Sequence, residues 1–359
     1  MSSNFKAPVL SHAEPGRSGD NFYRVAIVGA GTLKGKEVAE VLNERNFPAT
    51  DVKLLDDDES LGQLETVKDE VTFIQKIRAE EFRNLDFTFF ASDAECTRKN
   101  WGLARDAGSA IVDLSYALQD ENHAAVRAPW LERQLGKVAA PELQPGPAVI
   151  PHPEAVVLAL LSARLMKAGS VRQITATVLE PASEHGQKGM DELHEQTVNL
   201  LSFQQLPKKI FDAQVAFNML SRYGEQSHPP LSVIESNILK DFRRIAPDVM
   251  MPSLLLLQAP IFHGHAFAIH VTIAEVADVE RVSQAVAGEP VNITHGAEDA
   301  PSNVNAAGQS DIQLSVLPDT SNANGFWLWA ATDNLRVAAV TAVECAETMA
   351  VTRPRGKIQ

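Results

Sequence analysis

Three glycines stand where an apolar run gives way to a segment with helical spacing. Gly29, Gly31 and Gly35 follow the run YRVAIV and precede KEVAEVLNER. Glycines at such a junction let the backbone approach a pyrophosphate, which the N-terminus of the following helix attracts. The spacing departs from the usual dinucleotide fingerprint, so the glycines could also shape only a turn. The candidate cofactor-binding residues of this turn are Gly29, Ala30, Gly31, Thr32 and Gly35.

An acidic residue ends the next apolar run. Asp56 follows Val52–Leu55 and lies 21 positions after Gly35. A carboxylate at this place can accept hydrogen bonds from the ribose hydroxyls of NAD, and it repels the 2′-phosphate of NADP. If a dinucleotide binds, NAD is favoured. The acidic run from Asp56 to Glu59 could instead be a solvated loop, in which case no cofactor binds.

The elements that must position these residues alternate along the first part of the chain. Apolar runs at Asp86–Ala91 and Ala110–Leu114 flank a helix-like stretch, Trp101–Ala107. This alternation predicts a parallel, doubly wound sheet of Rossmann type. A proline-rich stretch, Pro141–Pro153, then predicts a domain boundary.

Beyond that boundary the pattern changes to an α+β domain with antiparallel pairing. We expect a helical region around Gly189–Phe203, a loop-rich part at Pro207–Pro230 and a last helix at Asp333–Thr352. The expected strands are Arg172–Leu179, Leu254–Pro260, Ala266–Glu275 and Asp311–Leu317. The predicted organisation is a tail (1–20), a dinucleotide-binding domain (21–150 with the helix 333–355) and a dimerisation or substrate domain (151–332).

Composition excludes several classes of protein. Of the 359 residues, 45% are hydrophobic and 22% charged, which is typical of a globular chain and not of a disordered one. The net charge of −14 disfavours binding to nucleic acid or anionic membranes, and no apolar run is long enough to span a bilayer. The two cysteines, Cys96 and Cys345, cannot form a disulfide framework, so we expect a reducing cytoplasm.

Several short motifs occur in an order that is similar to one enzyme family. They are Gly29-Ala30 with Gly35, Phe89-Phe90, Asp113-Leu114-Ser115, Gly189-Met190-Asp191-Glu192-Leu193, Ala216-Phe217-Asn218, Pro260-Ile261-Phe262-His263-Gly264-His265 and Asp333-Asn334-Leu335-Arg336. Together they resemble the aspartate-semialdehyde dehydrogenases, from about Tyr23 to the last helix. The resemblance adds Ser60 and Asn334 to the cofactor-binding candidates. It places Glu59 where the family has an arginine for the NADP phosphate.

The resemblance implies a fold and a set of partners. The fold would be an α/β Rossmann-type NAD(P)-binding domain plus an α+β dimerisation domain, as in glyceraldehyde-3-phosphate and aspartate-semialdehyde dehydrogenases. The second domain would form a homodimer through its sheet. The pathway would be the lysine, methionine and threonine branch of amino-acid biosynthesis. The small-molecule ligand itself stays unknown.

The same resemblance shows where the chemistry has changed. Ala155 stands at the position of the nucleophilic cysteine, and an alanine methyl group cannot form a thiohemiacetal. The family's base is retained as His265, and its substrate glutamate as Glu235. Other positions that differ are Glu180 for the glutamine that orients the substrate, Gln258 and Gln119 for two arginines, and Asn237 for a lysine. Neither Cys96 nor Cys345 is expected to replace the lost thiol.

The replaced residues leave three interpretations of the pocket. His152, Glu154, Glu180 and His265 could bind zinc or iron, or they could perform acid–base chemistry without a covalent intermediate. They could equally pair with one another or with water in a solvated cleft, and no metal-type spacing such as H-E-x-x-H is present. The function is accordingly a dinucleotide-binding or regulatory relative of the dehydrogenases. The alternatives are an enzyme with altered chemistry and an active dehydrogenase with a misaligned nucleophile.

Overall fold

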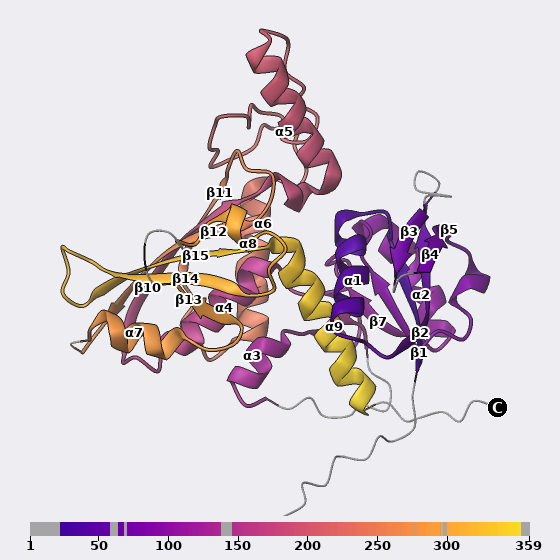
Figure 1. Cartoon of the computed structure of the whole chain (residues 1–359), viewed down its shortest axis with the longest axis horizontal. Coiled ribbons are helices and arrows are strands. Elements are labelled where there is room, and N and C mark those ends of the chain that lie inside the picture. Colours follow the sequence, from indigo (N-terminus) through magenta and orange to yellow (C-terminus); the bar gives the residue numbers. More distant parts are fainter. Residues whose placement is uncertain are drawn as a thin grey trace, which may run out of the picture.

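The computed structural model describes residues 22–57, 64–67, 70–137, 146–275, 277–294, 296 and 300–352. These residues build two large sheets at opposite ends of the molecule, with helices between and around them (Figure 1). The predicted tail 1–20 and the candidates Glu59 and Ser60 lie outside the described residues.

The first sheet confirms the predicted parallel, Rossmann-type architecture. In the described part of the chain its strand order is β5 (Gln75–Lys76), β2 (Ala49–Asp56), β1 (Tyr23–Val28), β6 (Phe87–Phe90), β7 (Ala110–Asp113), β9 (Ala148–Val149) and β8 (Ala125–Val126), all parallel. A separate antiparallel pair joins β3 (Leu64–Val67) and β4 (Glu70–Phe73). All of β6 and the last four residues of β1, Val25–Val28, are buried, as continuous apolar runs of parallel sheets usually are.

The second sheet is mixed rather than purely antiparallel. Its order is β11 (Ser253–Gln258), β10 (Val171–Glu180), β12 (His265–Ile273), β15 (Gly325–Thr332), β14 (Ile312–Pro318) and β13 (Val291–Ile293). The central pairs are antiparallel, as expected, but β10 runs parallel to β11 and β13 parallel to β14. Because β10 and β11 are parallel, Glu180 and Gln258 lie side by side at their carboxyl ends.

One helix lies at the centre of the molecule. All thirteen residues of α4 (Pro153–Leu165) are buried, and the helix contacts α3, α6, α7, α9 and β10. A helix surrounded by protein carries apolar residues on every side. The other helices are α1 (Leu33–Glu44), α2 (Ala94–Asp106), α3 (Pro129–Gln134), α5 (Gly186–Leu201), α6 (Leu231–Ile245), α7 (Val279–Val286), α8 (Asn303–Ala306) and α9 (Asn334–Thr352), with short 3₁₀ turns at Ala79–Phe82 and Ala182–His185.

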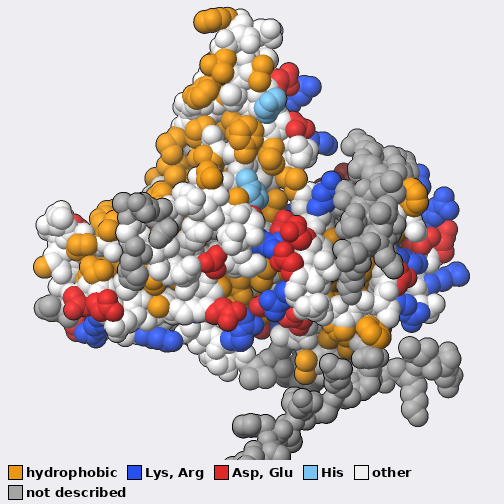
Figure 2. Space-filling model, in the orientation of Figure 1, with side chains coloured by type: hydrophobic (Ala, Val, Ile, Leu, Met, Phe, Trp, Pro, Cys, Tyr) orange, Lys and Arg blue, Asp and Glu red, His pale blue; other side chains and the backbone are white. Residues whose placement is uncertain are grey.

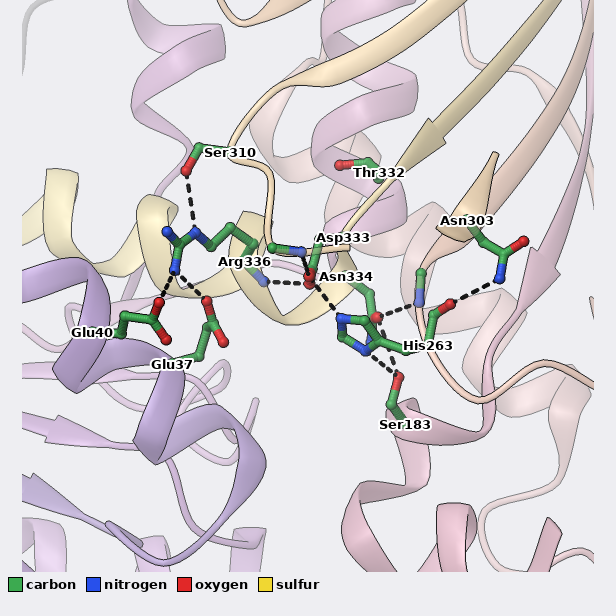
Figure 3. A network of polar contacts seen from close by, with 12 residues as sticks. Glu37, Glu40, Ser183, His263, Asn303, Ser310, Thr332, Asp333, Asn334 and Arg336 are labelled. Atoms are coloured by element: carbon green, nitrogen blue, oxygen red, sulfur yellow. Dashed lines mark hydrogen bonds and ion pairs between the residues drawn. The ribbon is translucent and has the colours of Figure 1, made fainter. Parts of the chain in front are cut away.

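The last helix, α9, joins the two halves. It packs against α1 and α4 and lies between the two sheets in Figure 1. Arg336 is 4% exposed, and its guanidinium bonds Glu37 of α1 at 2.6 Å (Figure 3). The same guanidinium also pairs with Glu44. The first half of α9 is buried on all sides rather than only along one face, since both halves of the molecule cover it.

Replacing Arg336 with glutamine is expected to lower the free energy of unfolding by about 3 kcal/mol. The change removes the buried partner of two α1 carboxylates, and breaking a buried ion pair is strongly destabilising. Urea unfolding at neutral pH measures the effect. The control is Arg105→Gln, which breaks an exposed pair with Asp106 and should change stability by roughly 0–1 kcal/mol. Equal effects of the two changes would contradict the role given to Arg336.

An arm carrying α5 projects from the second sheet, and exposed apolar side chains gather over it (Figure 2). The large apolar side chains of this region that are exposed are Val198, Leu201, Phe203, Phe217 and Met219. Exposed apolar surface of this extent usually marks an interface. Among the described helices, none combines the length and the apolar character that crossing a bilayer requires.

Candidate functional site

The glycine turn has the close packing expected of a dinucleotide-binding turn. A side chain at Gly29, whose φ is +84°, would lie 2.5 Å from the backbone of Ser92. A side chain at Gly35 would lie 2.1 Å from the carbonyl oxygen of Gly29, so the start of α1 touches the end of β1. The hydroxyl of Thr32 caps α1 by accepting from the N–H of Gly35 at 3.0 Å. The first N–H groups of α1 have no acceptor within the helix, which suits a pyrophosphate.

Asp56 is held against this turn. Its carboxylate accepts from the backbone N–H of Gly31 at 2.7 Å and from that of Asp57 at 2.9 Å, and the residue is 5% exposed. The structure therefore brings together Gly31 and Asp56, two candidates that are 25 residues apart. A negative charge stands beside the turn that would approach a dinucleotide.

Asn334, at the start of α9, makes its side-chain hydrogen bonds to Ser183, Glu184 and Gly264. Its side-chain oxygen accepts from Ser183 at 3.2 Å and from the N–H of Gly264 at 3.1 Å, and its amide donates to Glu184 at 2.7 Å. Figure 3 shows Asn334 beside His263, which bridges Ser183 and Asp333. These hydrogen bonds tie the start of α9 to the 3₁₀ turn Ala182–His185 and to Gly264. The role of Asn334 toward a cofactor stays a prediction.

Ala155 and His265 are both completely buried, and the residue next to Ala155, Glu154, faces His265. Ala155 lies in the first turn of α4 and His265 begins β12, and both are 0% exposed. The Nε2 of His265 lies 3.0 Å from Oε1 of Glu154, without the alignment of a hydrogen bond. Burial alone would raise the pKa of Glu154, but the charge of the facing His265 lowers it to about 2. Burial also opposes the charged imidazole, yet Glu154 raises the pKa of His265. The two buried side chains thus favour each other's charged form.

Glu180 belongs to a neutral network next to this pair. Burial, together with the charges of Glu154 and Glu184, raises the pKa of Glu180 well above its usual range, which favours the uncharged carboxyl group. Burial lowers the pKa of His185 to about 4, which keeps that imidazole neutral. The hydroxyl of Tyr223 lies 2.8 Å from Nε2 of His185 and 3.4 Å from Glu180.

Gln258 completes the neutral network. Its side-chain oxygen accepts from the hydroxyl of Tyr223 at 2.7 Å, and its amide donates to the carbonyl of Glu180 at 2.9 Å. The residue is 0% exposed. At the position where the resemblance expects an arginine for the substrate carboxylate, the chain therefore has an uncharged side chain whose hydrogen bonds are already made.

His152 points into a different set of contacts. Its Nδ1 lies 2.7 Å from the carboxylate of Asp241, which also accepts from the backbone N–H of His152 at 3.0 Å. The ring of Tyr116 stacks on the imidazole, with centroids 3.9 Å apart and planes 8° apart. Gln119, at the other expected arginine position, donates to the same Asp241 at 2.9 Å.

The remaining candidates lie in separate places. Glu235, on α6, accepts from the N–H of Leu256 at 2.9 Å and so braces β11. In the part of the chain that the structure describes, no three His, Cys, Asp or Glu side chains are arranged to hold a metal ion. His152 is bonded to Asp241, while His265 pairs with Glu154, so the four residues considered as metal ligands divide between two sets of contacts.

The thiols of Cys96 and Cys345 both have raised pKa values, unlike a catalytic nucleophile. Cys96 is half-buried on α2, where burial raises its pKa and the amide of Asn100 lies 3.6 Å from its sulfur. Cys345 is completely buried on α9, and burial raises its pKa strongly. A thiol with a raised pKa is a poor nucleophile at neutral pH.

Three residues of the site carried no signal in the sequence: Asp241, Tyr116 and Tyr223. Asp241 lies within a helix that the sequence analysis does not predict, 89 residues from its partner His152. Tyr116 directly follows the Asp-x-Ser segment, and its left-handed backbone (φ +63°) could not be expected of a tyrosine.

Comparisons with known proteins agree with this architecture. Residues 24–139 match the family model described as semialdehyde dehydrogenase, NAD binding domain, and residues 163–337 match semialdehyde dehydrogenase, dimerisation domain. A USG-1 protein homolog from Azotobacter vinelandii is 31% identical over 330 residues, which cover 90% of this chain and 97% of the relative. An aspartate-semialdehyde dehydrogenase from Rickettsia bellii is 27% identical, with 91% and 97% covered.

A solved structure supports the same conclusion. The structure of a probable aspartate-semialdehyde dehydrogenase from Pseudomonas aeruginosa superimposes with a TM-score of 0.79 at 28% identity, and the match covers 92% of this chain and 99% of that one. Fold, domain order and sequence therefore agree over nearly the whole length. The chain belongs to the semialdehyde dehydrogenase family, with its NAD-binding and dimerisation domains.

Proposed function

We propose that the protein is a dinucleotide-binding member of this family that does not perform the thiol-dependent, phosphorylating dehydrogenase reaction. The observation that carries the proposal is Ala155, which is completely buried where the resemblance places the nucleophile. No other thiol takes over, because Cys96 and Cys345 lie on α2 and α9 with raised pKa values. The neutral Gln258 adds support, since it lacks the charge that would hold an anionic substrate.

A binding or regulatory role fits these features better than the family reaction does. The glycine turn keeps the close contacts at Gly29 and Gly35 that a dinucleotide needs, whereas the pocket has lost its nucleophile. A bound dinucleotide would contact the turn and the first N–H groups of α1, and its nicotinamide would supply a hydride acceptor. The two unpaired cysteines suit a reducing cytoplasm.

NAD is expected to bind at least about tenfold more tightly than NADP, a difference of roughly 1.4 kcal/mol. The carboxylate of Asp56, held beside the turn, can accept from ribose hydroxyls but repels a 2′-phosphate. Calorimetric titration of the purified protein with each dinucleotide measures the two dissociation constants. In Asp56→Ser, whose folding is checked by its melting temperature, the preference for NAD should shrink or reverse. Tighter binding of NADP by the unchanged protein would contradict the preference, and binding of neither would contradict the proposed function.

We also propose a homodimer formed through the second half of the chain. The matched dimerisation domain spans residues 163–337, and the exposed apolar side chains over the arm, such as Leu201 and Phe203, lie within it. Phe203 is 98% exposed, an unfavourable state for a phenyl ring that a partner subunit would relieve. Sedimentation equilibrium at micromolar concentration should give twice the mass of the chain. A monomer under these conditions would rule out the proposed assembly.

A further inference from the structure

The imidazole of His152 is oriented as a proton acceptor. One carboxylate, that of Asp241, receives both the backbone N–H of His152 at 3.0 Å and its Nδ1 at 2.7 Å. The other oxygen of Asp241 accepts from Gln119 at 2.9 Å, and the residue is 0% exposed. A carboxylate fixed in this way holds the proton on Nδ1 of the neutral ring, and so leaves the lone pair of Nε2 available.

Of the two histidines near the former nucleophile position, only His152 can be reached from outside. Its side chain is 10% exposed, whereas that of His265 is 0% exposed and faces Glu154 at 3.0 Å. His265 is thus enclosed and committed to an ion pair. The residue that the resemblance identifies as the family's base is therefore a poorer proton acceptor in this chain than the histidine three residues before Ala155.

Contacts connect His152 to the glycine turn. The ring of Tyr116 stacks on the imidazole at 3.9 Å, and its hydroxyl accepts from Nζ of Lys34 at 3.1 Å. Lys34 lies in the first turn of α1, between Thr32 and Gly35 of the glycine turn. Tyr116 holds this position with a φ of +63°, a conformation that costs a non-glycine residue energy and persists where the surroundings require it. The imidazole is therefore two contacts away from the element that would bind a dinucleotide.

We propose that His152, oriented by Asp241, accepts the proton in a hydride-transfer reaction on an alcohol. The proton of the substrate hydroxyl passes to Nε2 of His152, while the hydride on the same carbon passes to the oxidised nicotinamide of NAD, and the C–O bond becomes a carbonyl. No covalent enzyme intermediate is formed, so the reaction needs no thiol at position 155. Positive charge near the dyad comes from Lys34, bonded to Tyr116 at 3.1 Å, and from Arg244, bonded to Gln119 at 2.8 Å. The inference rests on the proposed binding of a dinucleotide.

The orientation of the imidazole can be tested without any substrate. In protein labelled with ¹⁵N-histidine, nitrogen shifts distinguish the two neutral tautomers, and the signals absent from His152→Gln identify this residue. We expect the Nδ1–H tautomer in the unchanged protein and its loss in Asp241→Asn, whose amide can itself donate to Nδ1. A ring protonated at Nε2 in the unchanged protein would overturn the inference.

The reaction is tested by following NADH formation with a panel of small primary and secondary alcohols. We expect oxidation by the unchanged protein, and a decrease in kcat of about 10²–10⁴-fold in His152→Gln. Asp241→Asn, which preserves the shape of the side chain, should lower kcat with little change in KM, because Asp241 acts only through the imidazole.

The matched control is another histidine–aspartate pair, remote from the proposed base. His270, on β12, lies 3.0 Å from Asp319, its side chain is 21% exposed, and its ring packs against Trp327. His270→Gln should change kcat by less than about twofold. An unchanged rate in folded His152→Gln, or an equal loss in His270→Gln, would overturn the inference. NAD binding without oxidation of any alcohol would overturn this reaction alone, whereas no dinucleotide binding would overturn the proposed function with it.

Discussion

Ala155→Cys protein is expected to show no oxidation of aspartate semialdehyde, with phosphate and either NAD or NADP, above the uncatalysed background. Loss of a nucleophile that works as part of a unit costs on the order of a millionfold in rate, and restoring one member does not restore the unit. Here the other members are changed as well. Gln258 is bonded to Tyr223, and Gln119 to Asp241, so neither offers a charge to the carboxylate or phosphate.

Burial adds a second reason, because position 155 is 0% exposed. The introduced thiol should therefore react with Ellman's reagent much more slowly than it does after unfolding in guanidinium. The comparison is the triple variant Ala155→Cys/Gln119→Arg/Gln258→Arg. Among the unchanged protein, Ala155→Cys and this variant, turnover is expected only in the triple variant, provided that its fold accommodates the two added charges. Turnover by Ala155→Cys alone would show that the rest of the machinery is intact. Turnover by the unchanged protein would show that a different nucleophile exists.

Replacing Glu154 with glutamine is expected to lower the free energy of unfolding by about 3–5 kcal/mol near pH 6. The change removes the nearer counter-charge of a completely buried imidazole and leaves only the carboxylate of Glu184, at 3.8 Å, as an ion-pair partner. Removing one partner of a buried pair has costs of this size. Urea unfolding measures the difference, with Asp106→Asn, an exposed carboxylate, as the control at roughly 0–1 kcal/mol. A loss below about 1 kcal/mol would mean that the pair is neutral or reached by water.

The pH dependence of the same pair has a defined sign. The folded pKa of Glu154, about 2, is lower than its unfolded value of about 4.3, so its contribution to stability is complete above pH 4.3 and decreases toward pH 2. The folded pKa of His265 is raised, so its contribution is complete below about pH 6.5 and is lost as the pH rises through the folded value. The stability difference between the unchanged protein and Glu154→Gln should thus be largest between about pH 4.3 and 6.5.

The sequence predicts the first sheet well because its signals are local. The apolar run at β1, the glycine turn and the helical spacing of Val38, Val41 and Leu42 all lie within about twenty residues, and the three side chains are buried as expected. The last helix is confirmed for the same reason. The mixed pairing of the second sheet could not be predicted, because strand direction depends on connections that the pattern does not contain.

Two elements lacked a usable pattern. The helix α4 is apolar on every side, so it shows no helical periodicity, and its leading Pro153 resembles a loop signal. The strand β15 (GFWLWAAT) follows an unassigned stretch of Asp, Ser, Asn and Gly and is not predicted. In both cases burial within the folded molecule, and not local propensity, determines the element.

The contacts of the candidate site could not be predicted from the sequence. His152, Glu154, Glu180 and His265 are predicted as one set, and the structure divides their contacts among an Asp241 dyad, an enclosed ion pair and the network of Glu180. What separates His152 from the others is the carboxylate of Asp241, on a helix that is distant in sequence. The raised pKa of Glu180 likewise depends on burial beside other carboxylates, which sequence spacing cannot show.

The position of α9 has a consequence for how the protein is made. Chains emerge from the ribosome with the N-terminus first, and N-terminal domains usually begin to fold before synthesis ends. Here α1 is covered by α9, a helix translated after every strand of both sheets, and Arg336 provides the partner of Glu37 and Glu44. The nucleotide-binding half therefore cannot complete its packing until α9 has been translated. A nascent or prematurely terminated chain would expose the α1 face that α9 normally covers, which makes it a substrate for chaperones or proteases.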